Sequence, residues 1–155
     1  LQQSVEPGTP STRARLDTIA AARAAGFAPQ VFAMPLLPHL TDSTEHLTHL
    51  LSDIRDAGAA SVIYGPLHLR SQVKPWFFGW LEREHPALLP AYRSLYPGAS
   101  SRAPQQYRLA LAARIRPLIR RFGLEYRAED RQVLGHSLAS TARQVPGTPE
   151  ALTLF

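Results

Sequence analysis

Two short apolar runs, each preceded by Ala-Gly and followed by proline and leucine, are the clearest pattern in the chain. The first run extends from Val31 to Met34 and the second from Val62 to Tyr64. Each is too short for a helix and lacks polar alternation, which is typical of a strand buried on both faces of a parallel sheet. The intervening length fits one helix, so we expect a right-handed β-α-β crossover.

The segment before each run has helical spacing and its own end signals. Ser11 is placed to begin the first helix, and Gly26 stands where a left-handed residue would end it. Asp42 is expected to cap the second helix, and Gly58 to stop it. The apolar stripe of this second helix is Leu47, Leu50, Leu51 and Ile54. These patterns predict an α/β chain, at least through the second run.

The length permits one domain, but the strands do not complete a sheet. The chain has 155 residues, 45% of them hydrophobic, which is enough for a sizeable core. Two parallel strands need further neighbours and cover on both faces, and the sequence supplies no other confident strand. The first residue is Leu1 rather than methionine. We therefore expect a fragment, or a mature piece cut from a longer product.

The net charge and the absence of cysteine limit the partners and the metal sites that this chain can have. Seventeen Lys and Arg against twelve Asp and Glu give a net charge of +5, and Lys74 is the only lysine. This balance permits an anionic partner such as nucleic acid without requiring one. Zero cysteines exclude disulfides, thiolate zinc sites and thiolate-ligated iron–sulfur clusters within the chain. No apolar run approaches the ~20 residues of a membrane span and no signal peptide is recognised, so a cytoplasmic location is expected.

A series of motifs covers roughly the first three-quarters of the chain. In order, the main ones are Ser4-Val5-Glu6-Pro7-Gly8-Thr9-Pro10, Met34-Pro35-Leu36-Leu37-Pro38-His39-Leu40-Thr41-Asp42-Ser43, Leu67-His68-Leu69-Arg70, Trp76-Phe77-Phe78-Gly79-Trp80-Leu81 and His85-Pro86. Their order and spacing resemble the second half of the barrel of radical S-adenosylmethionine (radical SAM) enzymes. The resemblance is greatest to the DNA repair photolyase-like, or spore photoproduct lyase-like, group.

This resemblance implies a fold, two cofactors and an activity. The fold would be the C-terminal part of a partial (βα) TIM-like barrel with parallel strands, followed by a mainly helical extension. In the family, a CxxxCxxC loop holds a 4Fe-4S cluster, which binds S-adenosylmethionine and cleaves it to a deoxyadenosyl radical. The cluster ligands and the N-terminal half of the barrel would lie upstream of Leu1, so this segment alone would not be active. The intact parent would be a lyase-like enzyme acting on a nucleic-acid lesion.

The implied organisation has three regions. Residues 1–72 would form the βα units of the barrel, residues 73–123 a helical extension packed on it, and residues 124–155 an irregular or flexible tail. The aromatic residues of the middle region, Trp76, Phe77, Phe78 and Trp80, are expected mainly in the core.

The implied cofactor contacts lie where strands end, because the carboxyl ends of the strands face the active site in a βα barrel. Met34 and Pro35 end one strand, His68 and Leu69 follow the next, and Glu6 follows the preceding one. Met34 and Pro35 have an alternative explanation as the edge of a buried strand, and His68 as a structural histidine. No catalytic residue is assigned. No metal site is predicted either, because His46 and His49 fall away from the apolar stripe of their helix.

Residues 104–122 return to helical spacing, and Pro117 is expected to kink or end this helix. Its arginines Arg114, Arg116, Arg120 and Arg121 lie off the apolar stripe. Such arginines mark either a solvated face or a surface that contacts phosphates. The alternative function is therefore a non-catalytic nucleic-acid- or protein-binding module. A different, phosphate-binding βα barrel is disfavoured because neither strand ends in a Gly-rich loop.

The last residues carry a further partner prediction. Leu152, Leu154 and Phe155 resemble the short peptide by which bacterial repair and replication proteins bind the sliding clamp. Ala151 stands where that peptide usually has glutamine. The alternative is that this apolar end packs on its own domain.

Overall fold

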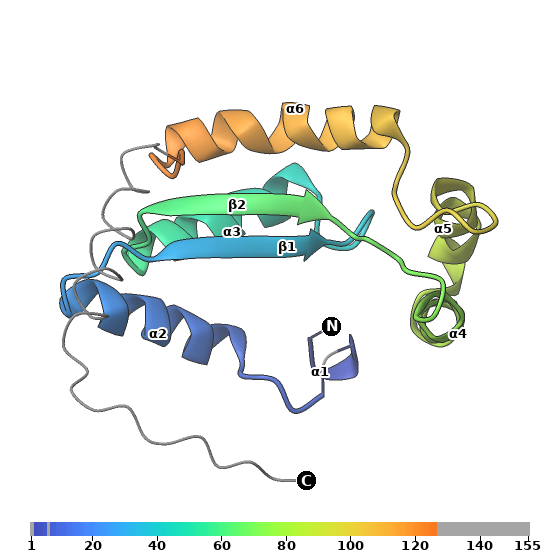
Figure 1. The fold of residues 1–155 in the computed structure, drawn as a ribbon, viewed down its shortest axis with the longest axis horizontal. Coiled ribbons are helices and arrows are strands. Elements are labelled where there is room, and N and C mark those ends of the chain that lie inside the picture. The colour runs from blue at the N-terminus through green and yellow to red at the C-terminus, as the bar shows by residue number, and fades with distance from the viewer. Residues whose placement is uncertain (1, 6, 127–155) are drawn as a thin grey trace, which may run out of the picture.

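The computed structural model describes residues 2–5 and 7–126 (Figure 1). Its elements are, in order, α1 (Gln2–Val5), α2 (Thr12–Ala24), β1 (Gln30–Leu36), α3 (Thr44–Asp56), β2 (Ser61–Pro66), α4 (Lys74–Glu84), the 3₁₀ turn η1 (Pro86–Leu88), α5 (Leu89–Leu95) and α6 (Gln105–Arg121). Both predicted strands and the helices that precede them are present, so the α/β prediction holds for this part of the chain.

The two strands pair in parallel, which confirms the predicted crossover through α3. Gln30 lies opposite Ser61, and the pairing continues regularly to Ala33. The register then shifts before Leu36 pairs with Pro66. Met34 and Pro35, joined by a cis peptide bond, occupy this irregular stretch of β1. The carboxyl end of β1 is therefore bulged away from regular pairing.

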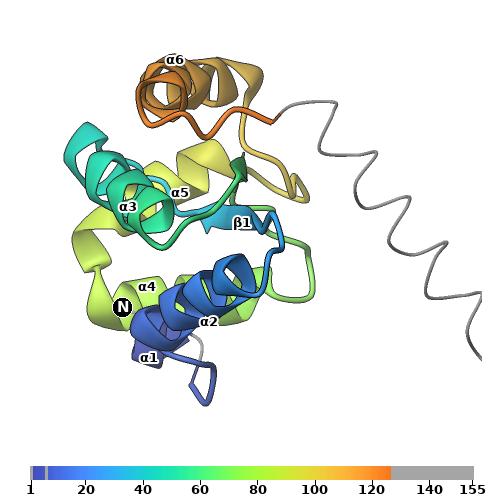
Figure 2. The same ribbon diagram turned by 90° about the vertical axis from the view of Figure 1, so that its left-hand side faces the viewer.

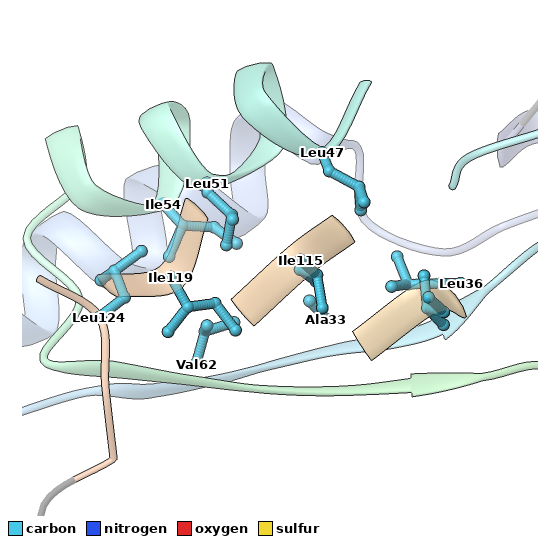
Figure 3. Packing of buried hydrophobic residues seen from close by; sticks show 10 residues of the cluster. Ala33, Leu36, Leu47, Leu51, Ile54, Val62, Ile115, Ile119 and Leu124 are labelled. Atoms are coloured by element: carbon cyan, nitrogen blue, oxygen red, sulfur yellow. The ribbon is translucent and has the colours of Figure 1, made fainter. Parts of the chain in front are cut away.

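One face of the sheet is covered by α3 and α6, and the main core lies between them and the strands (Figure 3). The sheet contributes Ala33 and Val62, and α6 contributes Ile115 and Ile119 among others. The buried residues of this core are Ala33, Leu36, Leu47, Leu51, Ile54, Val62, Leu111, Ile115, Ile119 and Leu124. The helix α6, which comes from the region predicted as a helical extension packed on the barrel, thus shares one core with the two-stranded sheet.

The opposite face of the sheet is left exposed by the described part of the chain. Phe32 is 61% exposed and Met34 46% exposed, and Ile63 lies beside Phe32 in the strand pairing. A Cβ built on Gly65 would stand 3.6 Å from the Met34 Cε, which places Gly65 beside Met34 on the same face. We call these four residues the open sheet face. In Figure 1 the helix α3 lies behind the strands, while α6 runs along β2 and α2 along β1.

The predicted barrel fragment is wrong. Within the described part of the chain the sheet has two strands only, and everything after β2 is helix, turn or loop. The helix α6 returns to pack beside α3 on the face of the sheet that α3 also covers. A small two-stranded parallel sheet with helices therefore replaces the expected barrel segment.

A second core lies under α4, η1 and α5, away from the sheet (Figure 1). Its buried members are Leu37, Leu69, Phe77, Trp80, Leu81, Tyr92, Tyr96 and Ala103. The segment that forms it, which we call the helical lobe, begins and ends at adjacent backbone. His68 pairs with Arg102 in an antiparallel bridge, and the Leu69 N–H donates to the Ser101 carbonyl over 2.8 Å.

The observed helix ends can be compared with the start and stop residues that the sequence predicts. Gly26 and Gly58 adopt the predicted left-handed conformation, with φ of 86° and 87°. The N-cap of α3 is Ser43, whose Oγ accepts from the His46 N–H over 3.1 Å, so the prediction that Asp42 caps this helix is wrong by one residue. The Asp42 carboxylate instead accepts hydrogen bonds from His39 in its own loop and from two residues of α6.

The sequence predicts a kink or an end at Pro117, and the helix α6 does not end there but continues to Arg121. Proline at this position cannot donate to the carbonyl four residues earlier, at Ala113. Both residues are exposed, so the freed carbonyl lies on the solvent side of the helix. Among the helices of residues 2–5 and 7–126, none has the length and apolar character needed to cross a membrane.

Candidate functional site

The candidate site lies where β1 and β2 end, and it includes the loop of residues 37–43, which several hydrogen bonds fix. Three side chains fix this loop. Thr41 Oγ1 accepts from the Leu37 N–H over 2.8 Å, and Asp42 Oδ1 accepts from the His39 N–H over 2.8 Å. The Tyr92 hydroxyl donates to the Pro38 carbonyl over 2.8 Å. The loop is therefore held from within and from the helical lobe.

His39 adopts an uncommon backbone conformation in this loop. Its φ is 61°, in the left-handed region that residues other than glycine rarely enter. The bond from its N–H to Asp42 holds that conformation, while its side chain is exposed. An imidazole is thus presented at the end of β1 on a backbone that Asp42 fixes.

Asp42 joins this loop to α6. It is 4% exposed, and its Oδ2 accepts from the Tyr107 hydroxyl over 2.7 Å and from Arg114 Nη2 over 2.9 Å. With the His39 N–H, the carboxylate accepts three hydrogen bonds, which is the satisfaction that a buried charge requires. Arg114 is half-exposed, and its buried Nε has no hydrogen-bond partner among the described residues.

Burial and the Asp42 charge act on the surrounding tyrosines. Burial raises the pKa of the Tyr107 hydroxyl, and its hydrogen bond to Asp42 raises it further. Burial likewise raises the pKa of Tyr92, to which the charges of Tyr96 and Asp42 add. The pKa of Tyr96 is raised by burial alone. As hydrogen-bond donors, Tyr92 and Tyr107 hold the loop through Pro38 and Asp42, whereas the Tyr96 hydroxyl donates to the Leu67 carbonyl just after β2.

The predicted cofactor residues at the strand ends have different surroundings. Met34 and Pro35 are exposed at the bulge of β1. His68 is exposed just after β2, with its Nε2 2.9 Å from Ser101 Oγ. Leu69 is 1% exposed in the second core, and its N–H is already bonded to Ser101. Three of the predicted residues are thus accessible, while Leu69 is enclosed.

The remaining predicted residues fall outside this arrangement. Glu6 and the clamp-binding residues Leu152, Leu154 and Phe155 lie outside the described residues. His46 and His49 are exposed on α3, and the part of the chain that the structure describes holds no cluster of three His, Cys, Asp or Glu suited to a metal ion.

Helix α6 carries five arginines, and the four that the sequence analysis singled out divide into two groups; the fifth, Arg108, is exposed near the start of the helix. Arg114 is bound to Asp42 and does not join the others on the surface. Arg116 Nε donates to the Tyr64 hydroxyl over 3.3 Å, and Arg116 and Arg120 line a shallow pocket of about 260 Å³ with Glu125. The Arg121 guanidinium lies 5.7 Å from the Phe122 ring centroid. Arg116, Arg120 and Arg121 are therefore the exposed arginine surface of α6.

Sequence reasoning missed the group formed by His39, Asp42, Tyr107 and Arg114. The sequence predicts Asp42 as a helix cap and Arg114 as an arginine off the apolar stripe of its helix, on a solvated or phosphate-contacting face. The available signal was an acidic residue in the loop after a strand, together with an arginine near the middle of a helix that also carries a core stripe. Neither signal identifies the other partner.

Comparison with known proteins gives long relatives without an assigned activity. The chain is 47% identical over 124 residues to uncharacterized proteins of Mycobacterium tuberculosis (strain ATCC 25618 / H37Rv) and Mycobacterium bovis (strain ATCC BAA-935 / AF2122/97). The match covers 80% of this chain but 36% of each relative, so the chain spans about a third of their length. No family model and no solved structure matches it.

Proposed function

We propose that this chain is the C-terminal portion of a radical SAM enzyme of the DNA repair photolyase-like group. In this proposal its carboxyl-end surface contacts S-adenosylmethionine. The observation that carries the proposal is the position of Met34 and Pro35. They belong to the motif that resembles the family, and they are exposed at the bulged end of a parallel strand. The mycobacterial relatives support it by their length, since most of it lies outside the match.

Of the two cofactors that the resemblance implies, the residues of this chain fit S-adenosylmethionine but not the 4Fe-4S cluster. A chain without cysteine does not hold the 4Fe-4S cluster, whose ligands would come from another part of the longer protein. The open sheet face is apolar, and its exposed Phe32 and Met34 suit contact with an adenosine ring. When bound to the cluster, S-adenosylmethionine supplies an organic radical. This chain's role would be to bind and orient it through Met34, Pro35 and His68.

The proposal is tested first at the level of the gene. We expect the reading frame upstream of the codon for Leu1 to continue into a CxxxCxxC loop. The longer protein, purified without oxygen and reconstituted with iron and sulfide, should cleave S-adenosylmethionine to 5′-deoxyadenosine, measured by chromatography. A frame that contains no such cysteines, with no partner gene that supplies them, would exclude the enzymatic proposal.

Met34→Arg in the longer protein should weaken S-adenosylmethionine binding roughly tenfold, equivalent to about 1.4 kcal/mol, because a cation would replace apolar surface next to a sulfonium. The measurement is the KM for S-adenosylmethionine together with the dissociation constant from equilibrium dialysis. Met34→Leu should restore binding. Phe27→Arg is the matched control, because Phe27 is 62% exposed at the opposite end of β1. Equal losses in the two arginine variants would contradict a specific contact at Met34.

A second candidate, binding of nucleic acid without catalysis, is favoured by the exposed arginine surface of α6. Replacing its three arginines with glutamine should weaken binding of duplex DNA. The slope of log K against log salt concentration should fall in magnitude by about 2.7, since each phosphate contact contributes about 0.9. Fluorescence anisotropy at several salt concentrations provides the measurement.

The control for this test is a triple variant of exposed arginines elsewhere on the molecule. Arg13, Arg70 and Arg83 are exposed and lie outside α6. Their replacement by glutamine removes the same total charge. If both triple variants lower the slope equally, the effect is one of net charge, and the α6 surface has no specific role.

A further inference from the structure

The helical lobe contains a buried ammonium group that faces a groove. Lys74, the only lysine of the chain, is the first residue of α4 and is 8% exposed. Its Nζ donates to the Gly98 carbonyl over 2.7 Å and to the Ser100 carbonyl over 2.9 Å. An ammonium has three donors, so one N–H remains after these two bonds.

The charge of Lys74 is not balanced by a carboxylate. Its hydrogen-bond partners are neutral carbonyls, and none of the ion pairs among the described residues includes it. Its other close neighbour is the Phe78 ring, whose centroid is 5.8 Å from Nζ. Burying a cation without an opposite charge is costly, so this position favours an anion that approaches from the groove.

The groove itself has a volume of about 580 Å³ and runs between α4 and the end of α5. It is lined by Lys74, Pro75, Phe78, Arg93, Tyr96, Pro97 and Gly98. Both of its charged residues are cationic and neither aspartate nor glutamate is among them. The other side chains are prolines and aromatic rings, which offer flat apolar walls.

Two more features add positive potential at this position. The helix α4 begins at Lys74, and its N-cap Val73 provides no side-chain hydrogen bond. The partial positive charge of the helix end is therefore met by the neutral Arg70 carbonyl, which accepts from the Lys74 N–H, and not by a side-chain oxygen. Arg93, on α5, is exposed, so its guanidinium is accessible to a ligand in the groove.

We propose that this groove binds a small aromatic anion, with the phosphate or carboxylate at Lys74 and Arg93 and the planar ring against Phe78 and the prolines. This site is separate from the open sheet face, and it does not depend on the proposed radical chemistry. A nucleotide and an aromatic carboxylate share the required chemistry, so the test includes both.

Because Lys74 is the only lysine, binding of a ligand in the groove can be followed through its amide signal by NMR. Protein labelled with [¹⁵N]lysine gives one backbone amide signal, from Lys74. This signal should shift on titration with 5′-AMP or with indole-3-acetate, and the stronger response identifies phosphate or carboxylate as the preferred anion. Adenosine, which lacks the anion, and inorganic phosphate, which lacks the ring, should bind at least tenfold more weakly. If phosphate binds as tightly as 5′-AMP, or if neither aromatic anion shifts the signal at millimolar concentration, the proposal is wrong.

Variants locate the site. Arg93→Gln should weaken binding of the responsive probe severalfold, and Lys74→Met should weaken it at least tenfold, both measured by calorimetry. Arg83→Gln, an exposed change on the same helix outside the groove, should have no effect. Circular dichroism establishes whether Lys74→Met folds, and Arg93→Gln carries the test alone if it does not. Unchanged affinity in Arg93→Gln would overturn the proposed site.

Discussion

Asp42→Ala should lower the free energy of unfolding by about 3 kcal/mol. The substitution leaves the His39 N–H, the Tyr107 hydroxyl and the Arg114 guanidinium without their shared acceptor. Removing one partner of a buried ion pair costs about 3–5 kcal/mol, and the lower end applies because the Arg114 side chain is 37% exposed and partly hydrated. Urea unfolding followed by tryptophan fluorescence measures the change.

Two controls separate the buried ion pair from the helix cap beside it. Ser43→Ala removes the actual N-cap of α3 and should cost about 1 kcal/mol. Arg114→Met combined with Asp42→Ala should cost less than the sum of the two single changes, because the double variant leaves no unpaired charge. If Asp42→Ala is no more damaging than Ser43→Ala, Asp42 does not hold the loop to α6 as described.

The protein should lose stability steeply above pH 10. Burial raises the pKa of Tyr92, Tyr96 and Tyr107 in the folded state, whereas tyrosine in the unfolded chain titrates near 10. The folded state therefore retains three protons that the unfolded chain releases. Their contribution is complete below about pH 10 and is lost above it, at up to about 1.4 kcal/mol per pH unit for each tyrosine.

The measurement is the urea midpoint at several pH values, with tyrosinate absorbance recorded in parallel. Three of the five tyrosines should ionise only as the protein unfolds. Tyr96→Phe should reduce the slope of stability against pH by about a third, while Tyr126→Phe, at an exposed position, should leave it unchanged. Ionisation of all five tyrosines before the tryptophan signal changes would contradict the burial described for these three.

Local sequence patterns were sufficient to predict the two strands and the helix that precedes each of them. Gly26 and Gly58 stop their helices because only a residue that tolerates positive φ suits those positions. The apolar stripe on α3 predicted which of its residues are buried, since helical spacing fixes the face whatever that face covers. The strand pair followed from composition and from the length of the crossover.

Long-range contacts were not predictable in the same way. Asp42 meets Tyr107 and Arg114 at separations of 65 and 72 residues, and a capping pattern explains an aspartate before a helix equally well. The stripe of α6 was visible in the sequence, but the surface it covers depends on where the helical lobe returns the chain. The barrel prediction came from family resemblance, and it was wrong because the two strands of the described residues form a small sheet that shares its core with α3 and α6.

The paired ends of the helical lobe have a consequence for how this architecture can vary. The chain leaves the sheet at His68 and comes back at Arg102, and these two positions are bridged. A segment whose two ends meet can be lengthened, shortened or exchanged while the elements on either side keep their spacing. The lobe is thus connected as an insertion within the sheet-and-helix framework, and it is the natural position at which homologous chains would differ in length and in ligand.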